Sequence, residues 1–171
     1  FYPSKGKERI KSMIETRPDW CVSRQRVWGV PLPIFISKKT GDVLVDDEVF
    51  ENIAKIYEKE GSDCWFNEDY QIFLGDKYKA EDYEKLSDIV EVWFDSGSTH
   101  SFVLEKRDDL KWPASMYLEG SDQHRGWFHS SLLESCGTRG VAPFESILSH
   151  GFVVDGKGLK MSKSTGNVIA P

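Results

Sequence analysis

Two lysines late in the sequence have the type and spacing to hold a polyphosphate. Lys160 and Lys163 belong to the run Lys-Met-Ser-Lys-Ser of residues 160–164, and Lys157 precedes them. Glycines on both sides predict a loop that can move, because glycine accepts backbone angles that other residues refuse. Ammonium groups neutralise phosphate charge, while hydroxyls and backbone N–H groups donate hydrogen bonds to phosphate oxygens. The run therefore predicts a phosphate-binding loop; the alternative is an ordinary solvated lysine loop.

A second candidate site is the run Glu-Gly-Ser-Asp-Gln of residues 119–123. Gly120 would let a sugar or a flat ring approach the backbone. A carboxylate at a strand-to-helix turn can accept from ribose hydroxyls or bind a substrate ammonium. The N–H groups at the start of the following helix favour an anion such as an α-phosphate. The alternative for Asp122 is that it only caps that helix.

A third stretch of interest mixes aromatic and basic side chains. Trp20 and Trp28 bracket Arg24 and Arg26, and the prolines that follow predict an extended exit. One interpretation places the tryptophans in a core and the arginines on the surface. The other makes the arginines contacts for RNA.

Hydrophobic periodicity and turn residues predict helices that alternate with strands. Helices are expected over residues 4–16, from Asp46 or Asp47 to Glu60, and from Gln123 to about Cys136, with Ser4, Asp46 or Asp47, and Asp122 as caps. Residues 34–37 and 43–45 predict a β-hairpin, and strands are expected at 89–94, 115–118 and 146–154. Residues 62–85 are expected to be irregular.

The elements over residues 115–154 follow the strand, helix, strand order of a parallel sheet. Ligands of such sheets bind at the carboxyl ends of the strands. That edge would collect Asp95, residues 119–123 and the lysine loop. The sequence therefore predicts an α/β fold.

The charge of the chain is negative overall but unevenly distributed. The 171 residues carry a net charge of −6, yet residues 1–30 hold seven Lys or Arg against three acids. Residues 41–95 hold seventeen acids against five lysines. This contrast predicts two structural units, and residues 36–88 are expected to form an acidic α+β insertion whose charge mainly serves solvation.

Cysteine usage and hydropathy exclude several classes of protein. Cys21, Cys64 and Cys136 are odd in number and far apart, so neither a disulfide framework nor a zinc site is expected. A reducing cytoplasm is the simpler expectation. No run approaches the roughly 18 apolar residues of a membrane span, so no membrane partner is expected.

Four motifs together resemble the isoleucyl branch of the class I aminoacyl-tRNA synthetases, in its bacterial form. They are Trp-Cys-x-Ser-Arg-Gln-Arg-x-Trp-Gly-x-Pro at 20–31, Asp-x-Val-x-Val-Trp-Phe-Asp-Ser-Gly-Ser at 88–98, Tyr-Leu-Glu-Gly-Ser-Asp-Gln-x-Arg-Gly-Trp-Phe at 117–128, and Lys-Met-Ser-Lys-Ser at 160–164. The motifs are long and in order, and the resemblance covers nearly the whole chain, the acidic insertion least.

The resemblance implies the second half of a Rossmann-type nucleotide-binding catalytic domain. Residues 1–35 would follow the editing insertion, residues 36–88 would be an inserted connective peptide, and residues 89–171 would complete the domain and end in the lysine loop. Such a ligase makes isoleucyl-adenylate from isoleucine and ATP with Mg²⁺, then transfers the acyl group to tRNA(Ile). The full-length enzyme is expected to be monomeric and cytoplasmic.

The resemblance also implies roles for individual residues. Lys163 would bind the ATP phosphates, with Lys160 assisting, and Gly120 and Asp122 would lie near the ribose. Glu119 and Gln123 would contact the isoleucyl-adenylate, and Trp127 and Trp93 would form aromatic walls around its side chain. Arg24 and Arg26, in the basic stretch, are candidates for contacts to tRNA.

The sequence departs from the family in several respects, since the editing domain, the anticodon-binding helices and the C-terminal zinc region are absent from it. It lacks the His-Ile-Gly-His signature that class I enzymes carry on the first helix of the nucleotide fold, and the four histidines show no such spacing. Both ends look cut, so the chain alone is expected to be inactive. Two other hypotheses stay open, a standalone RNA-binding module and a protein-interaction role for the acidic insertion.

Overall fold

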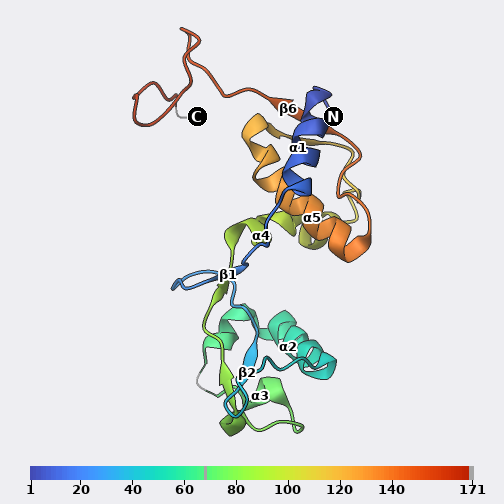
Figure 1. The fold of residues 1–171 in the computed structure, drawn as a ribbon, viewed down its shortest axis with the longest axis vertical. Coiled ribbons are helices and arrows are strands. Elements are labelled where there is room, and N and C mark those ends of the chain that lie inside the picture. Colours follow the sequence, from blue (N-terminus) through green and yellow to red (C-terminus); the bar gives the residue numbers. More distant parts are fainter. Residues whose placement is uncertain (68, 170–171) are drawn as a thin grey trace. The chain divides into compact units, whose positions relative to one another are not determined.

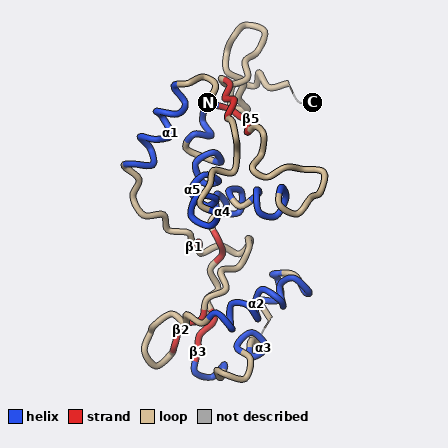
Figure 2. The backbone as a smooth tube through the Cα atoms, turned by 90° about the vertical axis from the view of Figure 1, so that its right-hand side faces the viewer, coloured by secondary structure: helices blue, strands red, loops and turns tan. Residues whose placement is uncertain are grey.

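The computed structural model describes residues 1–67 and 69–169 as a mixture of helices and short strands (Figures 1 and 2). The chain forms two compact units. Unit 1 combines Phe1–Asp19 with Trp93–Pro171, and unit 2 is Trp20–Val92. Each unit has a hydrophobic cluster of its own.

Unit 1 is built around two parallel strands. Strand β5 (Tyr117–Gly120) pairs with β6 (Ile147–His150) in a register that sets Tyr117 opposite Ile147 and Gly120 opposite His150. On the other edge of β6, Tyr2 forms a parallel bridge to Leu148. The helices of this unit are α1 (Lys5–Glu15), α4 (Val92–Gly97) and α5 (Trp127–Arg139), with a π-helical turn at His100–Leu104 and a 3₁₀ turn at Ser121–His124.

The core of unit 1 lies between the strand pair and helices α1 and α5. Its buried members are Ile10, Tyr117, Phe128, Phe144 and Ile147. The helix predicted over residues 4–16 is confirmed by α1, although the Ser4 side chain makes no capping hydrogen bond. The parallel pairing predicted for the strands of residues 115–154 is also confirmed, although β5 begins two residues later than the strand expected at 115–118 and β6 is shorter than the strand expected at 146–154.

The strand predicted at 89–94 is wrong beyond its first two residues. Strand β4 covers only Ile89–Val90, and the apolar residues that follow begin helix α4. Hydroxyls just after them favour the helical turn, since Ser98 Oγ donates to the Asp95 carbonyl at 2.9 Å and Thr99 Oγ1 to the Ser96 carbonyl at 2.6 Å. Trp93 therefore stands on a helix and not on a strand.

The start of α5 also differs from the prediction. Residues 121–124 form a 3₁₀ turn, so α5 begins at Trp127, and Gly126 is its N-cap residue. The Gln123 side-chain oxygen accepts from the Trp127 backbone N–H at 2.9 Å, which supplies the helix with the acceptor that Gly126 lacks. The prediction that Asp122 caps this helix is therefore wrong. The Asp122 carboxylate instead accepts a hydrogen bond from the Gln123 side-chain amide at 3.2 Å.

Unit 2 contains two antiparallel strand pairs and one long helix. Strand β1 (Ser23–Arg24) pairs with β4, and β2 (Phe35–Ser37) pairs with β3 (Tyr83–Lys85). Helix α2 (Asp47–Glu60) is followed by α3 (Gln71–Leu74) and by 3₁₀ turns at Ser62–Phe66 and Ala80–Asp82. The unit packs around Trp65, which is fully buried and donates its indole N–H to the Leu86 carbonyl at 2.8 Å.

The predicted cap of α2 is confirmed at Asp46. Its carboxylate accepts from the backbone N–H groups of Glu48 at 3.0 Å and Val49 at 3.3 Å. Hydrogen bonds from the Lys77 ammonium and then the Tyr78 hydroxyl lower the pKa of Asp46 to about 2. This one side chain therefore joins the start of α2 to the segment that follows α3.

Three other expectations for this unit need correction. The hairpin of 34–37 and 43–45 is confirmed only in its core, where the Ile36–Val43 bridge is flanked by a hydrogen bond from the Leu44 N–H to the Phe35 carbonyl at 2.9 Å, and β2 pairs over its whole length with β3 instead. Residues 62–85 are not irregular, since the buried Trp65 organises short helices there. The unit is also wider than the expected insertion of 36–88, because the β1–β4 pair ties residues 23–24 to residues 89–90.

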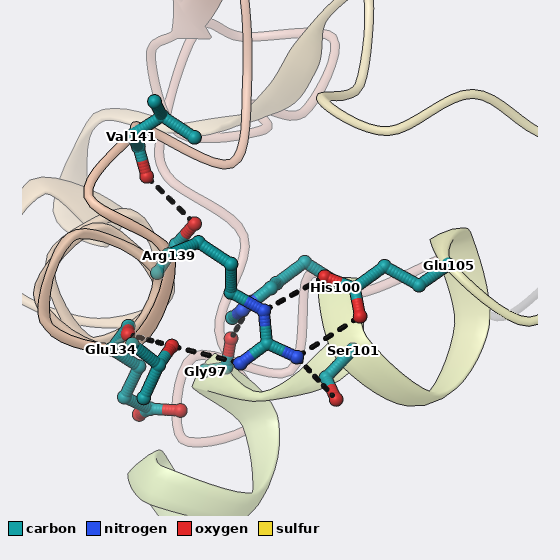
Figure 3. A network of polar contacts seen from close by, with 9 residues as sticks. Gly97, His100, Ser101, Glu105, Glu134, Arg139 and Val141 are labelled. Carbon is teal, nitrogen blue, oxygen red and sulfur yellow. Dashed lines mark hydrogen bonds and ion pairs between the residues drawn. The ribbon is translucent and has the colours of Figure 1, made fainter.

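Helices α4 and α5 meet at a buried carboxyl group. Both oxygens of Glu134 are buried without a hydrogen-bond partner, and they lie against Gly97, where a side chain would collide with them. Burial, and secondarily the Asp95 carboxylate, raises the pKa of Glu134 to about 8. The nearby Arg139 pairs instead with Glu105, its Nε donating at 2.8 Å (Figure 3). Glu134 is therefore a neutral acid at pH 7.

This buried acid predicts how stability depends on pH. Between about pH 4.5 and 8 the unfolded chain releases the Glu134 proton while the folded chain keeps it, so stability falls as pH rises. Glu134→Gln should remove this fall and stabilise the chain at pH 8.5 by on the order of 1–3 kcal/mol, with little effect near pH 4.5. Denaturant unfolding across this pH range would measure it.

Glu8→Gln is the matched control, since Glu8 is an exposed acid of helix α1. In the Glu8→Gln variant, the free energy of unfolding should fall with rising pH as it does in the unsubstituted chain. If the free energy of unfolding of the Glu134→Gln variant fell as steeply with pH as that of the unsubstituted chain, Glu134 would have to be ionised in the folded state.

Candidate functional site

The carboxyl end of β5 carries the acidic run that the sequence singled out. Glu119 and Asp122 are exposed, whereas Gly120 between them is buried. The Glu119 carboxylate accepts from the Gly120 N–H at 3.2 Å. A Cβ atom on Gly120 would lie 2.5 Å from Oδ1 of Asp122, so only glycine lets the Asp122 carboxylate fold back over this backbone. The turn therefore presents two exposed carboxylates on either side of a buried glycine.

The two tryptophans of the predicted pocket have different environments. Trp127 is half-buried: its ring stacks on Tyr117 with centroids 4.1 Å apart, and its indole N–H donates to the Ser96 carbonyl at 3.0 Å. Trp93 on α4 is 43% exposed. Trp127 is thus partly a core residue, while Trp93 offers an open aromatic surface.

Gly126 is the point where these groups converge. A Cβ atom there would lie 2.5 Å from the Gln123 side-chain oxygen and 3.1 Å from the Trp93 ring. The structure therefore brings Gln123, Trp93 and the start of α5 together around one glycine. Sequence reasoning missed Gly126; the only signal was a glycine directly before a tryptophan at a helix start.

The lysine loop is closed by its own hydrogen bonds. It leaves β6 and turns back at Asp155–Gly158, with a bridge between Val154 and Lys160 (the red end of the ribbon in Figure 1). The Asp155 carboxylate accepts from the Leu159 N–H at 2.9 Å and from the Asn167 amide at 2.9 Å. These bonds lower the pKa of Asp155, that from Asn167 most. Sequence reasoning missed the hydrogen bond between Asp155 and Asn167 that closes the loop, called here the Asp155–Asn167 clasp.

The lysines of the loop face different surroundings. The Lys160 ammonium lies 3.5 Å from the centre of the Phe152 ring, a cation–π contact, and the Lys163 side chain is exposed. The Ser162 hydroxyl bonds to those of Ser164 at 3.2 Å and Thr165 at 2.7 Å. Within residues 1–67 and 69–169, no hydrogen bond or ion pair joins Lys160 or Lys163 to the run 119–123.

The two arginines of the third stretch belong to unit 2. Arg24 in β1 donates to the carbonyls of Cys21 and Ser23, both at 2.7 Å, and lies 3.9 Å from Glu91. Arg26 is exposed, and Trp28 is 89% exposed. The interpretation of Trp28 as a core residue is therefore wrong for this chain: it stands in a loop with no core around it.

Among the residues that the structure describes, no group of three or more His, Cys, Asp or Glu side chains is placed to hold a metal ion. Within the same residues, no helix combines the length and the apolar character that crossing a bilayer requires.

Comparison with known proteins identifies the family. The model of the class I tRNA synthetases for I, L, M and V matches residues 1–171. The chain therefore belongs to the class I tRNA synthetase family.

Its curated relatives include the isoleucine–tRNA ligase of Pelagibacter ubique, which is 85% identical over the whole chain and of which the chain covers 19%. That of Zymomonas mobilis is 60% identical over the whole chain, which covers 18% of it. The chain thus spans about a fifth of the length of these relatives. A solved structure of an Agrobacterium radiobacter leucyl-tRNA synthetase, in ternary complex with tRNA and LeuAMS, resembles it in fold, with a TM-score of 0.58 at 19% identity over 95% of this chain and 24% of that one.

The convergence at Gly126 predicts the effect of a single methyl group. Gly126→Ala should displace the Gln123 amide and the Trp93 ring, which costs on the order of 1–3 kcal/mol for overpacking. Loss of the Gln123 bond should also speed hydrogen exchange of the Trp127 amide. Unfolding and exchange measurements on the 171-residue chain would detect both effects.

Gly137→Ala is the control, because Gly137 lies on the same helix and no atom comes within 4 Å of its added Cβ. It should be neutral or stabilising, since alanine favours helix. Equal stability and equal Trp127 amide exchange in the two variants would contradict the close contact of Gln123 and Trp93 with Gly126.

Proposed function

We propose that this chain is part of an isoleucine–tRNA ligase and supplies half of its adenylate-forming site. The 85% identity to the Pelagibacter ubique ligase over the whole chain is the observation that carries the proposal. The parallel β5–β6 pair supports it locally, because a carboxylate-bearing turn and a lysine loop follow its two strands.

In this proposal β5, α5 and β6 belong to the second half of a Rossmann-type nucleotide-binding domain. Residues 36–88, within unit 2, are the connective peptide inserted in it. The first half, with the His-Ile-Gly-His signature, lies in the longer protein. Such sheets bind ligands at the carboxyl ends of their strands, where Glu119, Gly120 and the lysine loop stand.

The reaction is attack of the isoleucine carboxylate on the α-phosphate of ATP, with pyrophosphate as the leaving group. Negative charge grows on the phosphoryl and leaving oxygens, and positioned cations stabilise it. Lys163, with its exposed ammonium, provides this charge in the proposal, and Lys160 assists after leaving the Phe152 ring. Mg²⁺ enters with ATP as part of the substrate.

The acidic turn binds the rest of the adenylate. Asp122 and Gly120 lie near the ribose, because the exposed Asp122 carboxylate can accept from its hydroxyls and the absent Gly120 side chain lets that carboxylate fold over the backbone. Glu119 binds the substrate ammonium. The Gln123 amide, fixed between Asp122 and the Trp127 N–H, lies near the reacting centre.

Trp93 and Trp127 form the walls of the isoleucine pocket in this proposal. Stacking on Tyr117 and the bond to the Ser96 carbonyl fix the Trp127 ring, so the wall is rigid. A rigid wall excludes larger side chains but rejects valine weakly, since one missing CH₂ changes the burial energy by only about 0.8 kcal/mol. The isoleucyl enzymes of this family are themselves the usual illustration of that limit, so it is a known property of the family.

The second substrate is tRNA(Ile), with Arg24 and Arg26 as candidate contacts. The Arg26 side chain is exposed, as a phosphate contact requires, whereas Arg24 already donates to two carbonyls. The full-length enzyme is proposed to act as a cytoplasmic monomer.

A chimera tests the proposal: this chain replaces the matching segment of the Pelagibacter ubique ligase. The chimera should catalyse isoleucine-dependent ATP–pyrophosphate exchange, and the 171-residue chain alone should not. In the chimera Lys163→Ala should lower kcat by about 10²–10³-fold while the isoleucine KM changes little, because the cation acts mainly in the transition state.

Lys157→Ala is the control, because Lys157 is an exposed lysine of the same loop outside the 160–164 run. It should retain most of the exchange activity. A raised isoleucine KM with unchanged kcat in Lys163→Ala would refute the assignment, and exchange by the chain alone would refute the division of the site.

A further inference from the structure

Unit 1 contains a cleft that none of the proposed roles uses. It has a volume of about 530 Å³ and lies between helix α1, the residues just after it, and the region of Arg125 and His129 at the start of α5. Its polar lining includes Arg9, Arg17, Arg125, Ser12 and His129. The residues of the acidic turn and of the lysine loop do not line it.

The charge of this cleft is positive in a chain whose net charge is −6. Among the described residues, three arginines line it and no acidic residue does. Arg9 and Arg125 are exposed, and within residues 1–67 and 69–169 neither forms an ion pair. A concave surface of one sign concentrates counter-ions, so this cleft selects for anions.

The inner wall of the cleft is a neutral histidine. His129 is 4% exposed, and its Nε2 lies 3.4 Å from a guanidinium nitrogen of Arg17. Arginine can only donate, so the ring accepts there and carries its proton on Nδ1. Burial, followed by Arg17 and Arg125, lowers the pKa of His129 and keeps it neutral. This contact therefore orients Arg17 without adding a negative charge to the cleft.

We infer that the cleft binds a phosphate group through the guanidinium groups of Arg9 and Arg125, with Arg17 in the wall beside them. Planar guanidinium forks match phosphate oxygens with paired hydrogen bonds, and the Ser12 hydroxyl adds a further donor. A volume of about 530 Å³ has room for more than a bare ion, so the phosphate can belong to a nucleotide unit.

Two sources supply this chemistry, a phosphodiester of the tRNA backbone and a free nucleotide or pyrophosphate. The tRNA source rests on the proposed function. A carboxylate from elsewhere in the longer protein is the competing occupant, and it would make the arginines structural.

The test uses the chimera with Arg9→Ala and Arg125→Ala combined. The control is Lys5→Ala with Lys7→Ala, which removes two positive charges from the same helix without touching the lining. Binding of tRNA(Ile) at several salt concentrations, calorimetric binding of pyrophosphate, and the melting temperature are measured for each protein. Arg17 is left unchanged, since its contact to His129 has a packing role.

A tRNA phosphate predicts that the arginine pair variant binds tRNA about tenfold or more weakly. The slope of log affinity against log salt should then become shallower by about 1, while pyrophosphate binding and the control stay unchanged. A free phosphate source predicts unchanged tRNA binding and at least about tenfold weaker binding of pyrophosphate. The Arg9→Lys, Arg125→Lys variant should recover part of the affected binding, because it keeps the charge.

Either pattern supports the phosphate site and identifies its source. Unchanged binding of both tRNA and pyrophosphate would overturn it, as would a fall in melting temperature with neither ligand affected, the result expected for an internal carboxylate. These outcomes are separate from the proposed function, whose failure appears as absent exchange in the unsubstituted chimera.

Discussion

The parallel pairing of β5 with β6 is the constraint on which the candidate site depends. Tyr117 and Ile147 face each other at the start of the pair and are both buried, which fixes the register. A slip by one residue would exchange the faces of a strand and expose one of these side chains. With the register fixed by the core, Gly120 and His150 end the two strands together, and the acidic turn and the lysine segment both begin at that edge.

The start of helix α5 positions the aromatic residues relative to the paired strands. Its first residue, Trp127, stacks on Tyr117 of the paired strand, so the helix start is fixed relative to the strand end. Gln123 then satisfies the Trp127 N–H across Gly126, and the missing side chain of Gly126 admits the Trp93 ring. Core packing, helix capping and the candidate pocket therefore share the same few atoms, which makes the pocket wall rigid.

Sequence patterns predicted the elements whose signals are local. Asp46 stands before a helical run and caps α2 as expected, because a cap needs only the residues that follow it. Asp122 has the same appearance in the sequence, but a 3₁₀ turn places the helix start at Trp127, and Gln123 becomes the acceptor. The run at 89–94 failed for a related reason: its β-favouring residues had a strand partner only as far as Val90. The motifs located the candidate site residues, whereas Gly126 and the Asp155–Asn167 clasp depend on tertiary contacts that no local pattern encodes.

The cations of unit 1 also differ in kind, and the difference matches two kinds of phosphate chemistry. Lys160 and Lys163 are compact charges on flexible stems in a loop closed by its own hydrogen bonds, so the loop can move as a unit while keeping its form. Such charges suit a group whose position and charge change during a reaction. The arginines of the cleft project from the region of two packed helices, and one of them is oriented by a buried histidine. Guanidinium forks suit a phosphate that is held in place and not transferred, which is the role proposed for the cleft, whereas the lysine loop is proposed to serve the phosphate that reacts.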